Sequence, residues 1–404
     1  MQNYSYTARD TYGKVVRGTM VAENELELSN KISNLGYYLV NSKIITLRQV
    51  KTSTTLLRLS PKELLTFTIH LATLLDAGVP LVASLRDLAR DETKEHIQKI
   101  IDDVRYRVEA GTSLKEALSV QHRSFPKLFI AIVGAGESTG KLGLCLNELA
   151  KLLEWQMELT AKMVEAATYP MILFCVMMGV VILMMVKMIP TFEPIFKEMH
   201  IALPAPTQFI LDMSHFVRRT WYISLGALIF LTAVYKFYNA TPKGKYVLDS
   251  FKLKIPLAGS LLRKVALSRF CHTFALGLKS GVNILSALDF AGEVVGNMRI
   301  QRSVEKAKDS VNIGEKLGTS FQVSGEFPPL VVRMISVGEQ SGALSHTLEK
   351  VNDFYDKEVP ATIKKLFALF EPLMIIFMAV VVGGIAVAIF LPMFKMADAI
   401  GGAK

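Results

Sequence analysis

The stretch FTIHLATLLDAGVPLVASL, residues 67–85, reappears in altered form as FCHTFALGLKSGVNILSAL, residues 270–288. At an offset of 203 positions the two stretches share their first Phe, their last Leu and a Gly-Val step that begins at Gly78 and at Gly281. This period is far longer than the roughly 20–50 residues of solenoid repeats. The repeat therefore predicts a duplicated domain.

The duplication continues after the loss of one residue, at an offset of 202. FPKLFIAIVGAGESTGKL, residues 125–142, then lies on FPPLVVRMISVGEQSGAL, residues 327–344. The shared turn positions are Gly136, Glu137, Gly140 and Leu142 in the first copy and Gly338, Glu339, Gly342 and Leu344 in the second. Four shared prolines lie near the ends of the apolar segments that follow: Pro170 and Pro190, matched by Pro372 and Pro392. Each repeat unit therefore includes an apolar segment.

The segment GAGESTGKLG, residues 134–143, is similar to a phosphate-binding loop but lacks two of its working positions. Ala135 stands where the first Gly should be, and Leu142 stands where the magnesium-binding hydroxyl should be. The second copy also has Ala343 in place of Lys141. The sequence therefore favours a tight turn between two helices over a nucleotide site.

In that turn, the first Gly is expected to end the preceding helix and the second Gly to allow close approach. Thr139 or Ser341 would N-cap the next helix, and the Glu would accept N–H bonds from that helix's positive end. A contact with a partner made by the same turn is the alternative.

Three apolar runs are long enough, or nearly long enough, to cross a bilayer, which needs about 20 residues. The first is uncharged over residues 166–186 and the third over residues 372–394, whereas the second is uncharged only over residues 220–235. Lys and Arg residues near the ends of these runs number ten on one side and five on the other. The excess predicts a cytoplasmic N-terminus, two cytoplasmic bundles and an external C-terminus.

The predicted fold is mainly α, with two homologous cytoplasmic helical bundles in tandem, three transmembrane helices and a small N-terminal β/α module. In the first bundle, Ser60, Pro61 and Glu63 form a capping box at a helix start. The predicted segments are 1–45 (β/α module), 46–59 (linker), 60–168 (first bundle), 169–189 (span), 190–219 (external loop), 220–238 (span), 239–371 (second bundle), 372–394 (span) and 395–404 (external tail).

The N-terminal module is predicted from alternating apolar residues on either side of a turn at Tyr12-Gly13, followed by a short helix and another strand. Partner docking and a simple cap on the chain are equally compatible with this pattern.

No catalytic or cofactor-binding constellation is present in the sequence. The seven histidines are scattered, and the three cysteines have no metal-ligand spacing. The net charge of +10 with a mean hydropathy of +0.33 favours an anionic membrane surface over nucleic acid as a partner. A transporter subunit is the second hypothesis. A proton-coupled carrier would need buried charges at mid-membrane, and the predicted spans contain almost no ionisable residue. A membrane receptor is the third, although residues 190–219 leave little room for an external domain.

The doubled motifs resemble one family over nearly the whole chain. LLDAGVPL with LKSGVNIL, GAGESTGKL with SVGEQSGAL, and the C-terminal FEPLMIIFMAVVVGGIAVAIFLPMF are similar to the type II secretion system protein F family, which includes platform proteins of type IV pili. The second copy departs from the pattern at Asn283, where the first has Pro80. That departure is expected to loosen one helix start.

The resemblance implies a non-enzymatic, homo-oligomeric platform in the bacterial inner membrane. Its partners would be a cytoplasmic hexameric ATPase, pilin-like subunits, inner-membrane alignment proteins and membrane lipid. No cofactor, metal or nucleic acid is implied for this chain as a whole. Because some family members bind calcium through cytoplasmic carboxylates, Asp91, Glu148 and Glu154 are the first candidates to test.

Overall fold

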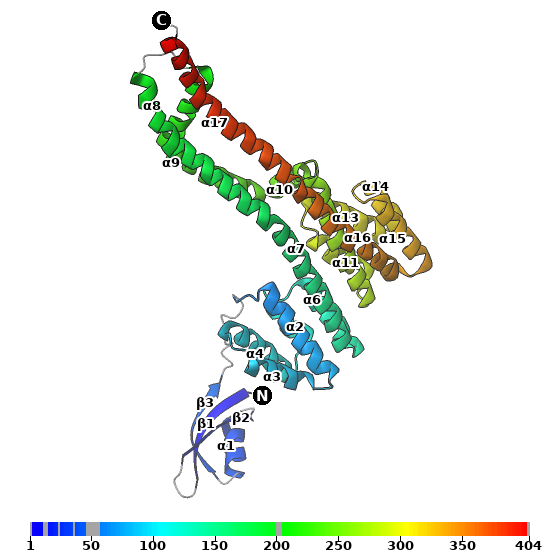
Figure 1. The fold of residues 1–404 in the computed structure, drawn as a ribbon. Helices are drawn as coiled ribbons and strands as arrows, with labels where there is room; N and C mark the ends of the chain where they lie inside the picture. The colour runs from blue at the N-terminus through cyan, green and yellow to red at the C-terminus, as the bar shows by residue number, and fades with distance from the viewer. Residues whose placement is uncertain are drawn as a thin grey trace.

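A computed structural model describes residues 2–10, 15–22, 25–34, 37–45, 57–198 and 204–401. Most of this part is helical, and it forms two bundles from which a long helical arm extends (Figure 1). The prediction of a mainly α protein with two repeated bundles is confirmed. The predicted turn at Tyr12-Gly13, most of the predicted linker and the last three residues lie outside the described residues.

The N-terminal module is a three-stranded antiparallel sheet with one helix. Strand β1 (Gln2–Asp10) lies between β2 (Val15–Ala22) and β3 (Tyr37–Ile45). Helix α1 (Glu25–Asn34) buries Leu28 and Ile32 against Ala8 of the sheet. The strands and the helix follow the predicted order.

The first bundle has five short helices and the beginning of a long one. The short helices are α2 (Pro61–Asp76), α3 (Leu81–Asp91), α4 (Glu95–Glu109), α5 (Leu114–Val120) and α6 (Lys127–Thr139). The predicted capping box is confirmed: Ser60 Oγ accepts from the Glu63 N–H, and the Ser60 N–H donates to the Glu63 carboxylate over 2.9 Å. Two orphan amides at the start of α2 are thereby satisfied.

The second bundle has a counterpart for each of these helices. They are α11 (Ala258–Lys279), α12 (Ile284–Val294), α13 (Met298–Asn312), α14 (Leu317–Ser324), α15 (Pro329–Ser341) and the long α16 (Leu344–Ala368). An additional helix, α10 (Pro242–Lys252), packs on α13. Its Asp249 carboxylate accepts from the Met298 N–H at the start of α13, over 3.0 Å.

Each bundle has its own hydrophobic core, and the two cores are built alike. In the first, the Phe67 and Phe125 rings meet edge to face with centroids 5.5 Å apart. In the second, Phe270 and Phe327 meet in the same way at 5.2 Å. Such offset contacts stabilise aromatic pairs. The duplicated apolar positions are therefore the interior of each bundle.

The arm consists of long helices, the first of which leaves its bundle without a break. Helix α7 (Leu142–Leu183) continues through a π-helical turn (Met184–Met188) into α8 (Ile189–Glu198), and α16 leads into α17 (Phe370–Gly401). The sequence predicted a separate span starting at residue 169, but α7 is continuous there. Pro170 lies inside α7 and Pro392 inside α17, while Pro190 follows the π turn and Pro372 lies in the first turn of α17. An interior Pro removes one backbone hydrogen bond, which a long helix tolerates with a kink. The role of these prolines as membrane boundaries stays a prediction.

The segment predicted as an external loop is largely helical. Besides α8, it contains the start of α9 (Ala205–Ala240), which has Pro204 at its N-cap and Pro206 in its first turn. Thr207 Oγ1 donates to the Ala388 carbonyl of α17 over 2.8 Å, and Ser214 Oγ donates to the Met185 carbonyl of the π turn over 2.5 Å. These bonds join α9 to the other two long helices.

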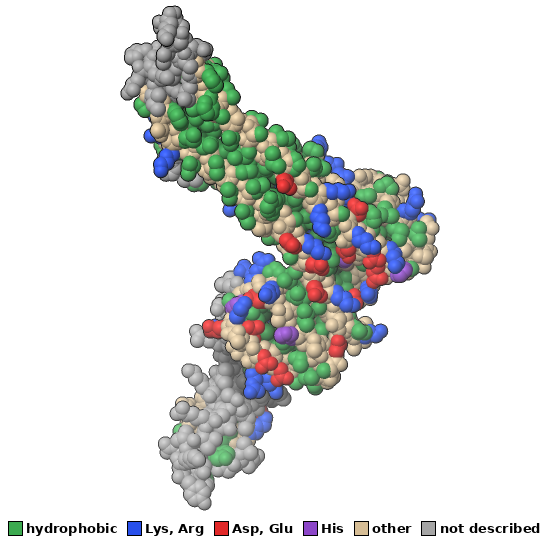
Figure 2. Space-filling model, viewed as in Figure 1, with side chains coloured by type: hydrophobic (Ala, Val, Ile, Leu, Met, Phe, Trp, Pro, Cys, Tyr) green, Lys and Arg blue, Asp and Glu red, His purple; other side chains and the backbone are tan. Residues whose placement is uncertain are grey.

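Two helical runs are long and apolar enough to cross a membrane among the described residues, Leu142–Phe192 and Leu344–Pro392. Their most apolar windows have mean hydropathies of 2.7 and 2.9, yet only 11% and 17% of each window is buried. Core helices of soluble proteins would be mostly buried. Figure 2 shows hydrophobic side chains over the arm and charged side chains gathered on the bundles. Helix α9 is not among these two runs.

Candidate functional site

The turn between α6 and α7 uses its two glycines in the opposite order from the one expected. Gly140, with φ of 68°, is the left-handed residue that ends α6, and the Lys141 N–H donates back to the Gly136 carbonyl over 2.8 Å. Gly136 is the close-approach position, because a Cβ there would lie 3.1 Å from the Leu142 Cα and 2.9 Å from the Cys145 Cβ. Thr139 does not cap α7, since its hydroxyl donates to the Ala135 carbonyl of its own helix.

Glu137 binds the positive end of a helix, but not the helix that the sequence suggested. Its carboxylate accepts from the Leu114 N–H over 2.7 Å and from the Lys115 N–H over 3.1 Å. These are the first amides of α5, which precedes the turn in the chain, rather than of α7, which follows it. Carboxylates at such amides form strong, charge-assisted hydrogen bonds. Glu137 therefore ties the turn to a helix begun 23 residues earlier.

The second turn repeats the carboxylate bonds and the roles of the two glycines. Glu339 accepts from the Leu317 N–H over 2.7 Å and from the Gly318 N–H over 3.1 Å, at the start of α14. Gly342 ends α15 with φ of 69°, and a Cβ at Gly338 would lie 2.8 Å from the Leu344 Cα. Ser341, like Thr139, donates to a carbonyl of its own helix instead of capping the next one. The Gly and Glu residues shared by the two turns therefore hold each turn to the rest of its own bundle.

The earlier Gly pair ends the first helix of each bundle. Gly78 and Gly281 have φ of 82° and 80°. Asn283 was expected to loosen the next helix start, and that expectation is wrong: its side chain accepts from the Ser286 N–H over 2.8 Å and caps α12. Pro80 at the same place in the first copy gives no side-chain cap.

Side chains from both copies meet along a seam formed by α7, α11 and α16. The Trp155 indole stacks on the His272 ring, with ring centroids 3.8 Å apart. Trp155 Nε1–H donates to Asp356 Oδ1 over 2.8 Å, and His272 Nε2 is hydrogen-bonded to the same oxygen at 3.0 Å. Burial opposes ionisation of Asp356, but the hydrogen bonds from His272 and Trp155 hold its pKa below the ordinary value. Lys279 adds a bridge between copies, with its Nζ 3.2 Å from both Glu148 and Glu349.

The sequence interpretation missed this seam, although the repeat contains a signal for it. At the offsets of the duplication, His272 corresponds to Ile69, Lys279 to Asp76 and Trp155 to Lys357. Positions where two copies differ in chemistry are the ones that can face the other copy. Comparing the copies for differences, rather than for identities, would have indicated these residues.

The three candidate calcium ligands lie on two helices. Asp91 ends α3, whereas Glu148 and Glu154 lie on α7. Glu148 is already paired with Lys151 at 2.9 Å and with Lys279. Burial opposes its ionisation, and the two lysines outweigh burial and lower its pKa. Within the described ranges, His, Cys, Asp and Glu side chains form no group of three or more that could hold a metal ion.

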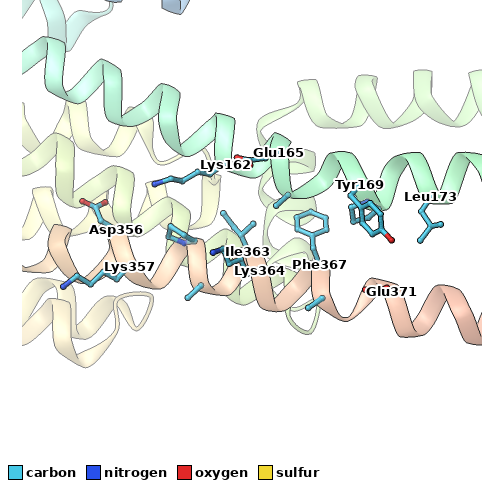
Figure 3. A pocket seen from close by; sticks show the side chains of 15 residues that line it. Lys162, Glu165, Tyr169, Leu173, Asp356, Lys357, Ile363, Lys364, Phe367 and Glu371 are labelled. Atoms are coloured by element: carbon cyan, nitrogen blue, oxygen red, sulfur yellow. The ribbon is translucent and has the colours of Figure 1, made fainter.

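A groove of about 970 Å³ opens where α7 and α16 pass from the bundles into the arm (Figure 3). Lys162, Glu165 and Tyr169 line it from α7, and Lys364 and Phe367 line it from α16. Most of its charged side chains lie at the bundle end, whereas Tyr169 and Leu173 lie toward the arm together with one carboxylate, Glu371.

These features define a class: a membrane protein in which two copies of a helical bundle, joined along a polar seam, are each continuous with an apolar helix. Residues 67–190 and 270–392 each match the family described as type II secretion system (T2SS), protein F, and residues 1–43 match its N-terminal domain. The chain belongs to the type II secretion system protein F family. The two matched ranges confirm the duplication.

Named relatives cover the chain almost from end to end. Type IV pilus assembly protein PilC of Thermus thermophilus is 38% identical over 400 residues, which are 98% of each chain. Type II secretion system protein F of Xanthomonas campestris is 32% identical over 410 residues, 99% of this chain and 100% of that protein. Type IV pilus assembly and type II secretion are therefore both represented among its relatives.

Proposed function

We propose that the protein is a non-enzymatic inner-membrane platform of a type IV pilus or type II secretion machine. In this proposal α9 is a third span beside α7 and α17. The N-terminal module and both bundles lie in the cytoplasm, and the C-terminus lies outside. The bundles receive a hexameric ATPase, and the arm meets pilin-like subunits and alignment proteins within a homo-oligomer.

One observation carries the proposal: each bundle leads into an apolar helix, without a break in the first copy and across the single residue Leu369 in the second. Helix α7 has 42 residues, which is about 63 Å at roughly 1.5 Å per residue. Leu146 and Leu149 at its start are buried in the first bundle, whereas Val176 and Ile182 in the arm are exposed. Because no loop interrupts α7 between these regions, a displacement of the bundle would be passed to the arm.

The seam supports a shared movement of the two bundles. Trp155 of α7 and Asp356 of α16 are hydrogen-bonded to each other, and Lys279 bridges both copies. A partner that shifts one bundle would therefore shift the other. Such coupling needs no covalent chemistry in this chain.

The proposal is tested by deleting the gene and scoring surface pili and secreted enzymes. Complementation with Glu137→Ala or Glu339→Ala should reduce assembly, because each removes the carboxylate that holds a turn to its bundle. Lys141→Ala is the matched control, since the second copy already has Ala343 at that place. Membrane levels of each variant are measured alongside, so that lost protein is distinguished from lost function.

Normal pili and normal secretion in the deletion strain would contradict the platform role. Substrate flux through proteoliposomes of the purified chain would instead favour the transporter hypothesis.

A further inference from the structure

The groove between α7 and α16 lies where the charged part of each helix gives way to its apolar part. After Glu165, α7 carries no charge over residues 166–186, and after Glu371, α17 carries none over residues 372–394. The groove walls include Glu165 and Glu371 on the charged side of this boundary and Leu173 on the apolar side. In a membrane, this boundary coincides with the headgroup layer.

The charges of the groove are balanced, and several of them are free. Three lysines and three carboxylates line it. Lys162 is paired with Glu158 at 2.7 Å, and Asp356 is held by His272. Lys357, Lys364, Glu165 and Glu371 form no ion pair within the described residues. Two free cations and two free anions thus face one cavity.

The apolar end of the groove is open and aromatic. Tyr169 is 61% exposed, and Phe367 and Leu173 continue the wall toward the arm. Exposed Tyr at the end of an apolar helix is typical of the membrane interface. The volume of about 970 Å³ is at the upper end of the range for ligand pockets, roughly 300–1,000 Å³.

We infer that this groove binds a zwitterionic phospholipid with a primary ammonium group. Its phosphate lies beside Lys364, its ammonium lies beside Glu165 on the opposite helix, and its acyl chains run along Tyr169, Phe367 and Leu173. An anionic lipid gains no net attraction from a lining with equal numbers of lysines and carboxylates, whereas a zwitterion matches both free charges. The lipid would fill the gap between the two copies at the base of the arm. This inference goes beyond the platform role.

Native mass spectrometry of the full-length chain, released from mild detergent, tests the proposal. Phosphatidylethanolamine is added at rising concentration, with phosphatidylglycerol as the anionic comparison. One phosphatidylethanolamine per chain is expected to bind in preference to phosphatidylglycerol. Lys364→Gln should weaken this binding about tenfold, the effect of losing one charge-assisted hydrogen bond. Leu173→Trp should also weaken it, by filling the apolar end.

Lys365→Gln is the matched control, because Lys365 is adjacent in the chain but does not line the groove. It should bind phosphatidylethanolamine like the unchanged protein. Equal binding by the Lys364 and Lys365 variants would overturn the proposal. So would a preference for phosphatidylglycerol, or adducts of detergent only. Thermal unfolding of each variant in detergent confirms that the fold is retained, and Leu173→Trp gives a second result if Lys364→Gln unfolds.

Discussion

The two bundles share the hydrogen bonds at their Glu turns and differ in the pair of residues that joins the first helix to the long helix. In the first copy, Asp76 accepts from Asn147 over 2.6 Å, joining its first helix to its long helix. In the second copy the same two places hold Lys279 and Glu349, and Lys279 also reaches Glu148 of the first copy. The Glu-to-amide bonds at the turns, by contrast, have the same lengths in both copies, 2.7 and 3.1 Å. Duplication therefore preserved what folds a bundle and changed what joins it to its twin.

The largest expected effect comes from removing the turn carboxylates, which should affect both copies alike. Glu137→Ala and Glu339→Ala each leave two amides at a helix start without their acceptor. Each should lower the free energy of unfolding by about 3 kcal/mol, measured by thermal unfolding of the full chain in detergent. A large loss in one copy and none in the other would show that the turns are not equivalent.

Substituting the close-approach glycines should destabilise the two copies by different amounts. Gly338→Ala would bring a Cβ against Thr347 Oγ1 and within 2.8 Å of the Leu344 Cα, which is backbone and cannot turn aside. Gly136→Ala meets its nearest atom at 2.9 Å, on the Cys145 side chain. Overpacking costs about 1–3 kcal/mol, and Gly338→Ala should lie at the upper end and Gly136→Ala at the lower. Equal melting temperatures for the two variants would contradict this ranking.

The seam should respond to loss of a single donor. Trp155→Phe keeps an aromatic ring beside His272 but removes the Nε1–H that donates to Asp356. The cost should be about 1 kcal/mol. If the seam joins the bundles, limited proteolysis should cut the variant between them sooner than the unchanged chain. Tyr106→Phe, an exposed change away from the seam, is the control and should leave the cleavage rate unchanged.

The smallest effect is a pH dependence from Glu63, a carboxylate for which the second copy has no counterpart. The hydrogen bond from Lys94, with help from the Ser60 amide, lowers the pKa of Glu63 from 4.5 to about 2. Because the folded-state pKa is depressed, the stabilisation is complete above 4.5 and is lost as the pH falls toward 2. Glu63→Gln should flatten the melting temperature over that window, whereas Ala266 at the matching place in the second copy carries no charge to titrate. An unchanged pH profile in Glu63→Gln would show that other carboxylates dominate.

Local signals in the sequence predicted the bundles well and the connections between elements poorly. The repeat, the capping box at Ser60 and the apolar spacing were sufficient for two helical bundles, because each depends on residues close in the chain. The Glu137 contact was misassigned because the backbone N–H groups that donate to its carboxylate belong to α5, which becomes a neighbour only after folding. Pro170 and Pro190 suggested helix ends because Pro disfavours interior positions, yet the apolar runs around them keep the chain helical. The seam depends on how two copies dock, which no single stretch encodes.

Within the arm, the backbone of the two copies differs at Met184–Met188, where the first copy has a π-helical turn. Pro190 has no N–H to give the Val186 carbonyl, and Ser214 supplies a donor to the Met185 carbonyl beside it. A turn that takes in one extra residue rotates everything beyond it by roughly 100° relative to an unbroken α-helix. Helix α17 runs through the matching residues as a plain α-helix. Equivalent side chains of the two repeats therefore lie on different sides of their helices in the outermost segments. A neighbouring molecule in the lipid would meet a different surface on each repeat.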